Sequence, residues 1–310
     1  MNAPPRTTGT SVGMFAIVAV IWWFSVLVVG AAAYGAGLLV GGRPLVWGMV
    51  AGLAWTASAL LLLVRPLEAG VARLLYRGLR RPGPAELERI VPAFRRVCRR
   101  AGADPGRYLL RVQEQPQVNA FALGGHLVAV TRVALELDDG MLEAVLAHEL
   151  GHHLHLHPLA TSLGWWYLLP FAVAEGAWRR IGRATRAMAR AFARLRGDGG
   201  GAPGGLLGLL VALGALVLVG TVLVVVLCVL WLPLLLLVRA ARLLGAGLSR
   251  AGERAADRHA VQLGYGADLV AVLELFVPGE LASPRPRGLA ALLQSHPSCQ
   301  ARLAAIRADG

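Results

Sequence analysis

Residues 147–152 read Ala-His-Glu-Leu-Gly-His and form an H-E-x-x-H pattern. His148 and His152 are four residues apart, so on a helix their imidazoles lie on nearly the same face, one turn apart. Two ring nitrogens at that separation can bind one Zn²⁺ at about 2.0–2.1 Å. Glu149 directly follows the first ligand and can accept a proton from a water molecule that the metal acidifies. The pattern therefore predicts a zinc site with a general base beside it.

The pattern lies in a segment that has the features of a helix. This helix is expected to run from Leu135 to about His157, with Asp138 or Asp139 as its N-cap. Further upstream, residues 84–102 are predicted to form an amphipathic helix, because their apolar residues recur at helical spacing.

A third protein ligand is required to complete a catalytic zinc site and leave one position open. Glu253 and Asp257 lie four apart on a later predicted helix, hence on one face. Glu253 would complete a His₂Glu ligand set. Asp257 would orient a ligand histidine through its other ring nitrogen.

Two segments are rich in β-forming residues and are predicted to be strands, Tyr108–Val112 and Leu127–Val133. The second has two compatible readings: an ordinary sheet strand, and a strand edge beside the metal that pairs with an extended substrate by adding it to the sheet. His126, which follows two glycines, is expected to belong to a hairpin turn.

Apolar residues gather in blocks. Of 310 residues, 56% are hydrophobic and only 16% are charged, where soluble proteins carry about a quarter. Residues 14–40 and 45–64 are each close to or above the length of about 20 residues that crosses a bilayer. Residues 1–64 are therefore predicted to form a transmembrane hairpin with both ends on one side.

The basic charge fits a membrane protein better than a nucleic-acid-binding one. All 31 basic residues are arginine, against 18 acidic residues, and the formal net charge is +13. The arginines flank the apolar blocks, as the positive-inside rule expects of the cytoplasmic side, so no nucleic-acid partner is predicted. Three widely spaced cysteines indicate a reducing compartment rather than a disulfide framework.

The chain is divided into four segments. Residues 1–64 are the hairpin, 65–157 the first half of a catalytic domain, 158–240 a membrane-associated and transmembrane insertion, and 241–310 the second half with the third ligand.

The insertion is expected to hold an apolar stretch at residues 158–174, a basic amphipathic helix at 179–196, a glycine-rich linker at 198–205 and a long apolar stretch at 206–238. Four spans are expected in all, and the residues of the last two are left open.

Taken together, these features resemble the HtpX-like and CAAX-prenyl-protease-type membrane gluzincins. The resemblance covers most of residues 84–157 and 250–305. It rests on four motifs in the family's order: Asn119-Ala120-Phe121-Ala122, His148-Glu149-Leu150-Gly151-His152, Glu253-Arg254-Ala255-Ala256-Asp257, and Ser295-His296-Pro297 with Arg302 six residues after the histidine.

The resemblance implies a mostly α fold with a small β-sheet, in which integral membrane helices accompany a cytosolic zincin-like metalloprotease domain. It implies one Zn²⁺ per chain, and it gives Asn119 and His296 the role of holding the substrate backbone or the oxyanion. In one departure, His157 stands where the family usually has an aspartate five residues after the second motif histidine.

Other polar residues have plainer readings. Arg302 is expected to be a solvated charge on a helix, and His153, His155 and His157 are expected to be surface histidines. Membership of a second metal site or of a pH-sensing group is the alternative for these three.

The sequence thus predicts a membrane-embedded zinc endopeptidase in the cell membrane, multi-pass, with its active site on the cytoplasmic side and of bacterial origin. Its expected substrates are membrane-associated proteins or peptides, with a role in protein quality control. The alternative is a non-catalytic membrane metal-binding or transport protein that uses the histidine cluster.

Overall fold

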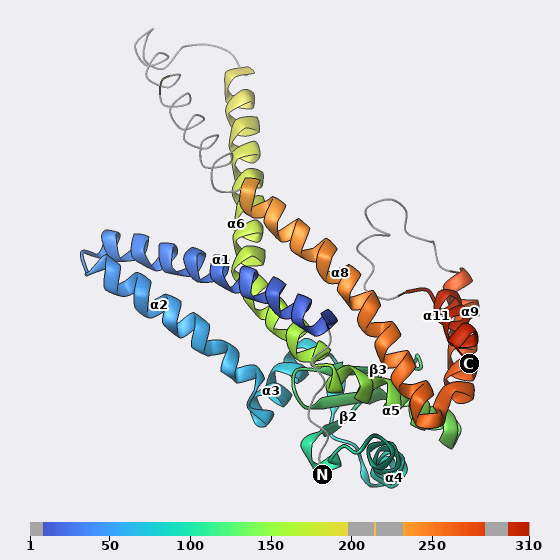
Figure 1. The fold of residues 1–310 in the computed structure, drawn as a ribbon. Helices are drawn as coiled ribbons and strands as arrows, with labels where there is room; N and C mark the ends of the chain where they lie inside the picture. Colours follow the sequence, from blue (N-terminus) through green and yellow to red (C-terminus); the bar gives the residue numbers. More distant parts are fainter. Residues whose placement is uncertain (1–8, 198–213, 215–231, 283–296, 310) are drawn as a thin grey trace. The chain divides into compact units, whose positions relative to one another are not determined.

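The computed structural model describes residues 9–197, 214, 232–282 and 297–309 (Figure 1). It divides into two compact units, Met1–Tyr167 with Arg242–Gly310, and Leu168–Ala241. Most described residues are helical, and one small sheet lies in the first unit. This confirms the predicted class, a mostly α fold with a small β-sheet and membrane helices.

The first unit begins with the predicted hairpin. Helix α1 (Gly9–Val40) and helix α2 (Pro44–Ser58), which continues into the 3₁₀ turn η1 (Ala59–Leu62), are joined by a turn in which Gly41 has a φ of 75°. The helices approach closely, because a Cβ on Gly48 would lie 3.0 Å from the carbonyl oxygen of Gly30. Small residues at such a crossing are typical of helix pairs in membranes.

Three described helices are long and apolar enough to cross a membrane by length and composition. They are Gly9–Val40, Pro44–Leu62 and Val238–Pro278, in which an 18-residue stretch has a mean hydropathy of 2.6, 1.8 and 1.5, respectively. The third also carries Glu253 and Asp257.

The sheet has four strands in the order β1-β2-β4-β3: β1 (Leu79–Arg80), β2 (Leu109–Gln113), β4 (Leu127–Thr131) and β3 (Ala120–Leu123). Strands β2 and β4 are parallel, and the other two pairs are antiparallel. Strand β4 is therefore paired on both sides, so the prediction that it presents an edge to substrate was wrong. The edge strand is β3. All five residues of Leu127–Thr131 are buried, as is typical of a central strand. The mainly apolar run of this segment in the sequence already indicated a central position in the sheet.

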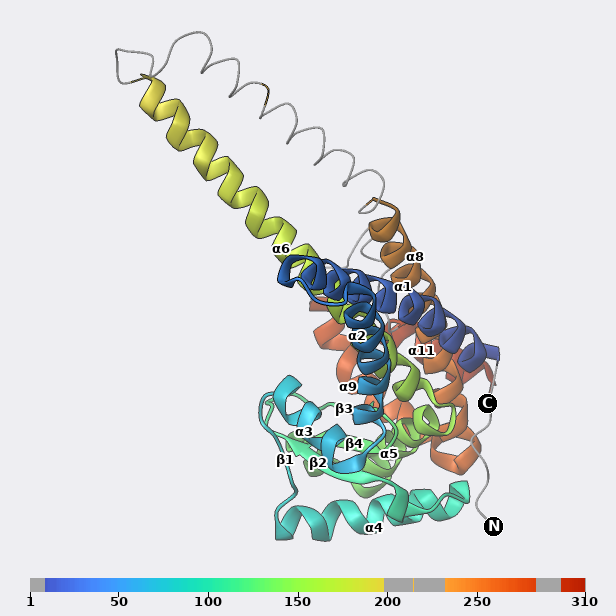
Figure 2. The same cartoon turned by 90° about the vertical axis from the view of Figure 1, so that its left-hand side faces the viewer.

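Helices cover both faces of the sheet. Helix α3 (Arg65–Leu75) packs on one face through Ala72, against Leu79, Leu127 and Ala129. The opposite face packs against α4 (Pro84–Ala101) and α5 (Asp139–Leu154), and Figure 2 shows α3 and α4 on opposite sides of the sheet.

The predicted helix around the H-E-x-x-H pattern ends earlier than expected. Helix α5 stops at Leu154 because Leu156 adopts a φ of 56°, and α6 (His157–Gly197) begins at the next residue. Asp138 is the N-cap residue, although its side chain makes no capping hydrogen bond. Residues 158–174 and 179–196, predicted as separate segments, belong to the single helix α6.

The C-terminal half of the chain is helical where it is described. Helix α8 (Leu232–Ala260) leads through a π-type turn (Val261–Tyr265), where Gly264 has a φ of 87°, into α9 (Gly266–Ala282), and α11 (Cys299–Asp309) follows. The predicted linker at 198–205 lies outside the described residues, as does the predicted apolar stretch 206–238 apart from Gly214 and its last seven residues.

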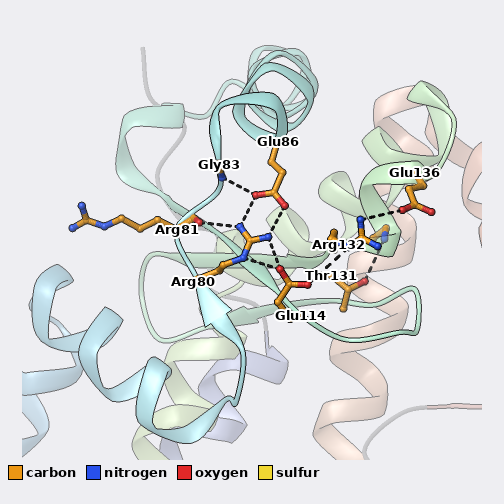
Figure 3. Close-up of polar contacts among 9 residues, drawn as sticks. Arg80, Arg81, Gly83, Glu86, Glu114, Thr131, Arg132 and Glu136 are labelled. Carbon is orange, nitrogen blue, oxygen red and sulfur yellow. Dashed lines mark hydrogen bonds and ion pairs between the residues drawn. The ribbon is translucent and has the colours of Figure 1, made fainter.

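A charged network fixes the end of the sheet to α4 (Figure 3). The guanidinium of Arg80 lies between Glu86 and Glu114, with Nη1 2.6 Å from Glu86 Oε2 and Nη2 2.6 Å from Glu114 Oε1. The hydrogen bond from Arg80 lowers the pKa of Glu86. Arg132 links Glu114 to Glu136 at longer distances, 3.9 and 3.8 Å.

Candidate metal centre

Three side chains converge at one face of α5: His148 and His152 from that helix, and Glu253 from α8. The two Nε2 atoms are 3.1 Å apart, and carboxylate oxygens of Glu253 lie 3.5 Å from His148 Nε2 and 3.3 Å from His152 Nε2. Donors at about 2.0–2.1 Å from a tetrahedral ion are themselves about 3.4 Å apart, so this set fits one small divalent cation. Within the described part of the chain, no other group of three or more His, Cys, Asp or Glu side chains converges in this way.

The packing of α5 explains how these donors meet. Leu142, Leu146 and Leu150 are fully buried in the core, which turns the opposite side of the helix toward α8. Gly151 permits the close approach of α8, because a Cβ there would lie 3.1 Å from Ala256 Cα. A larger residue at 151 would push away the helix that carries Glu253.

Asp257 lies one helical turn beyond Glu253 and contacts the same histidine from behind. Its Oδ1 is 2.9 Å from His148 Nδ1. Burial lowers the pKa of His148, but the hydrogen bonds to Asp257 and Glu253 outweigh it and raise this pKa to about 9. The contact with Asp257 uses Nδ1 and leaves Nε2 facing the other two donors, and Nε2 is therefore the nitrogen through which His148 would bind a metal.

Arg302, on α11, completes this chain of contacts, so the expectation that it is a solvated charge was wrong. Its Nε and Nη2 donate to Asp257 Oδ2 and Oδ1 at 2.9 and 2.5 Å, and Nη1 lies 3.7 Å from Glu253 Oε2. Its side chain is 14% exposed. In the sequence, only the position of Arg302 six residues after His296 pointed to a role at the site. No local pattern distinguishes a buried arginine from a solvated one.

Glu149 lines a cavity of about 460 Å³ together with the three converging donors. It is 6% exposed, and it follows His148 on the helix. The edge strand β3 also lines the cavity, and a further wall is apolar and comes from α9 through Leu269, Val272, Leu273 and Phe276.

Asn119, immediately before β3, is exposed at the cavity wall. Its Oδ1 accepts a hydrogen bond from the backbone N–H of Ala120 at 2.9 Å, and its own N–H donates to Thr131 Oγ1 at 3.0 Å. The side-chain amide nitrogen is thus the donor that the residue can offer to the cavity. His296, the other residue expected to hold the substrate, lies outside the described residues.

The histidines after the motif do not gather into one site. His153 is buried, and its Nε2 lies 3.0 Å from the carbonyl oxygen of Leu127; burial lowers its pKa to about 4, so its expected place on the surface was wrong. His157 lines the cavity with its ring 5.3 Å from the ring of His152. His155 lies instead near His259, at 6.5 Å between rings.

Glu68 was not singled out in the sequence, yet it fixes the turn that ends the edge strand. From α3, its Oε1 accepts the backbone N–H groups of His126 and Leu127, both at 3.1 Å, and its Oε2 lies 2.8 Å from His126 Nδ1. The turn residue Gly124 has a φ of 56° and donates its N–H to Ser162 Oγ. His126 is thus a hairpin residue, as expected. Nothing in the sequence around Glu68 indicated that its carboxylate would hold this turn.

Comparison with known proteins agrees with this site. The sequence profile of peptidase family M48 matches residues 84–309. A protease HtpX homologue of Pyrobaculum islandicum is 39% identical over 114 residues, which are 35% of this chain and 30% of that protein. The crystal structure of S. mikatae Ste24p aligns with a TM-score of 0.47 and 17% identity, over 94% of this chain and 63% of that one. The resemblance to HtpX-like gluzincins is confirmed. The matched residues cover less than a third of the HtpX homologue's length. Because the family profile matches most of its length, the chain belongs to peptidase family M48.

Proposed function

We propose that the chain is a membrane-embedded zinc endopeptidase. The observation that carries the proposal is the convergence of His148 Nε2, His152 Nε2 and the Glu253 carboxylate within 3.1–3.5 Å, with Glu149 beside them in the same cavity. Two imidazoles and one carboxylate are a ligand set typical of catalytic zinc, and they leave a position open.

The bound ion would supply Lewis acidity, which polarises the scissile carbonyl and acidifies water. Glu149 accepts the proton of the attacking water and returns it to the leaving amine. Asp257 holds His148 in one tautomer, and Arg302 holds Asp257. These two residues position the ligands, and Arg302 also lines the cavity.

The edge strand β3 supports a peptide as the substrate. One side of β3 pairs with β4 and the other lines the cavity, so an extended chain can add to the sheet there through backbone hydrogen bonds. Asn119 and His296 are proposed to hold the substrate backbone or the oxyanion. The apolar wall from α9 favours a substrate with bulky apolar side chains, as membrane-associated proteins in quality control would offer.

The hairpin α1–α2 supports a location in the cell membrane. The two helices carry no charged residue, and arginines follow directly after them. By the positive-inside rule we place the active site on the cytoplasmic side of a multi-pass protein, with catalytic halves at residues 65–157 and 241–310 around an insertion at 158–240. The arginine-rich, lysine-free composition supports a bacterial source.

The alternative, a metal-binding or transport protein, has less support. A transporter places ionisable residues within its spans, and α1 and α2 have none. The third candidate membrane helix carries Glu253 and Asp257, but both carboxylates contact the histidines of the metal centre. The histidine cluster that such a protein would use points in different directions: His153 toward the sheet, His155 toward His259 and His157 into the cavity.

The test is Glu149→Gln, compared with Glu136→Gln as a matched control, since Glu136 is an exposed acid in the 3₁₀ turn Val133–Glu136 that precedes α5. With the full chain in detergent and a casein-type or membrane-protein substrate, we expect cleavage to be lost in the first variant and kept in the second. Both should retain about one zinc per chain. Cleavage by Glu149→Gln at the wild-type rate would refute the assigned base, and full zinc binding without cleavage in the wild type would favour the alternative.

A further inference from the structure

Helix α3 has two apolar faces, although only one packs on the protein. On the inner side, Ala69 and Ala72 are buried, and Ala72 packs against the sheet. On the outer side, Leu67 is 44% exposed and Leu74, seven residues later, is 86% exposed. A one-sided apolar stripe left open to solvent on a surface helix is typical of contact with a lipid interface.

The position of α3 in the chain agrees with this contact. The helix begins at Arg65, three residues after η1 closes the second apolar helix at Leu62. The intervening Leu63 and Val64 are also exposed, at 43% and 45%. Exposed apolar residues are therefore found on both sides of Arg65, at the end of the hairpin and on α3.

Below this helix lies a buried arginine that forms no ion pair among the described residues. Arg111, on β2, is 9% exposed, and its Nε is buried with no hydrogen-bond partner. Its Nη1 donates only to the carbonyl oxygen of Leu110, at 2.8 Å. Burial lowers the pKa of Arg111, and the nearby charges of Arg73 and Arg81 lower it further.

The sheet register explains why these arginines gather. Leu79 pairs with Gln113 and Arg80 with Val112, and Arg81 and Arg111 are the residues that follow this last pair. Arg111 pairs with Ala129 of β4, on the face that α3 covers. Arg73 comes from α3 itself. Figure 3 shows the side chain of Arg81 extending away from the acidic partners of Arg80.

No carboxylate among the described residues forms an ion pair with these three arginines. Glu68 is the acid that raises the pKa of Arg111, but its effect is smaller than the effects of burial, Arg73 and Arg81, which all lower it. Both Glu68 oxygens are already engaged by the β3–β4 turn. A buried cation surrounded by like charges is costly unless an anion compensates it.

We propose that Arg73, Arg81 and Arg111 bind the phosphate of an anionic phospholipid headgroup, whose acyl chains lie along Leu67 and Leu74. Guanidinium groups suit this ligand because their paired N–H donors match phosphate oxygens. A free phosphate would satisfy the charges but would leave the apolar stripe of α3 uncovered, so the structure favours the lipid. The proposal does not depend on peptidase activity.

The test measures lipid binding by the full chain in detergent. Native mass spectrometry detects the bound species after addition of phosphatidylglycerol, phosphatidylcholine or inorganic phosphate. The triple variant R73Q/R81Q/R111Q is compared with R95Q/R99Q/R107Q, which removes the same charge from exposed arginines of α4 and of the 3₁₀ turn Pro105–Arg107. We expect the first to lose phosphatidylglycerol binding by about tenfold or more, and the control to bind as the wild type does. Equal binding by both triple variants, equal binding of phosphatidylcholine, or displacement of the lipid by inorganic phosphate would overturn the proposal.

A second measurement covers the case in which the triple variant folds poorly. Thermal unfolding of Arg111→Gln is followed with and without phosphatidylglycerol. Without the lipid, we expect the variant to be at least as stable as the wild type, since it removes an uncompensated buried charge. Adding phosphatidylglycerol should raise the melting temperature of the wild type more than that of the variant. Equal increments in the two proteins would refute the site.

Discussion

Replacing Arg302 by leucine tests whether the contacts behind the metal centre matter as the structure indicates. Arg302 closes a chain that runs from its guanidinium through Asp257 to His148. The bonds to Asp257 are short and forked, and the two side chains are 14% and 5% exposed. The substitution removes the cation and leaves the carboxylate in place.

The expected cost follows from this burial. Breaking a buried ion pair by removing one partner costs about 3–5 kcal/mol, because a charge is left without compensation. Asp257 keeps its contact with His148, so we expect the lower end, about 3 kcal/mol of the free energy of unfolding. Loss of an orienting partner behind a metal ligand typically weakens metal affinity by about 10–100-fold, and we expect a loss in that range.

Denaturant unfolding of the metal-free protein and zinc competition with a chelator measure the two effects. Arg307→Leu is the matched control, because Arg307 lies on the same helix and pairs with Glu274, but both side chains are more than half exposed, at 60% and 52%. Exposed pairs contribute about 0–1 kcal/mol, so this variant should change little. Arg302→Lys keeps the positive charge but loses the paired hydrogen bonds to Asp257, so its stability and zinc affinity should lie between those of the two leucine variants. If Arg302→Leu and Arg307→Leu proved equal in stability and in zinc affinity, the reasoning would be wrong.

Three further outcomes are expected. Glu68→Ala should lower the free energy of unfolding by about 2–4 kcal/mol, because two backbone N–H groups at the β3–β4 turn lose their acceptor. Glu68→Gln keeps one oxygen and should lower it less. Denaturant unfolding compares the two variants, and an equal loss of stability would contradict the assigned hydrogen bonds. Chelation should lower the melting temperature of the wild type and added zinc should restore it, while His148→Ala should not respond to either. Cys98 should react with iodoacetamide only after unfolding, as judged by mass spectrometry, since it is fully buried and burial raises its pKa to about 12.

Local patterns predicted the parts of the site that depend on helical spacing. His148 and His152 share a face because they are four residues apart, and Glu253 and Asp257 share one for the same reason. The hairpin followed from the length of two apolar blocks. The strand that forms the sheet edge was misassigned, because strand order depends on which distant segments pair and not on the residues of one strand.

The amino-acid sequence by itself determined the metal-binding pattern, the helices that carry it and the apolar hairpin, since each depends on neighbours within a few residues. Tertiary structure alone decided that Arg302 lies behind Asp257, that Glu68 holds the turn of β3, and that Arg111 is buried with its Nε lacking a hydrogen-bond partner. The physical reason is that the energy of a charged side chain is set by its burial and its partners. In this chain those partners lie 45 residues away for Arg302 and 58 or 59 for Glu68.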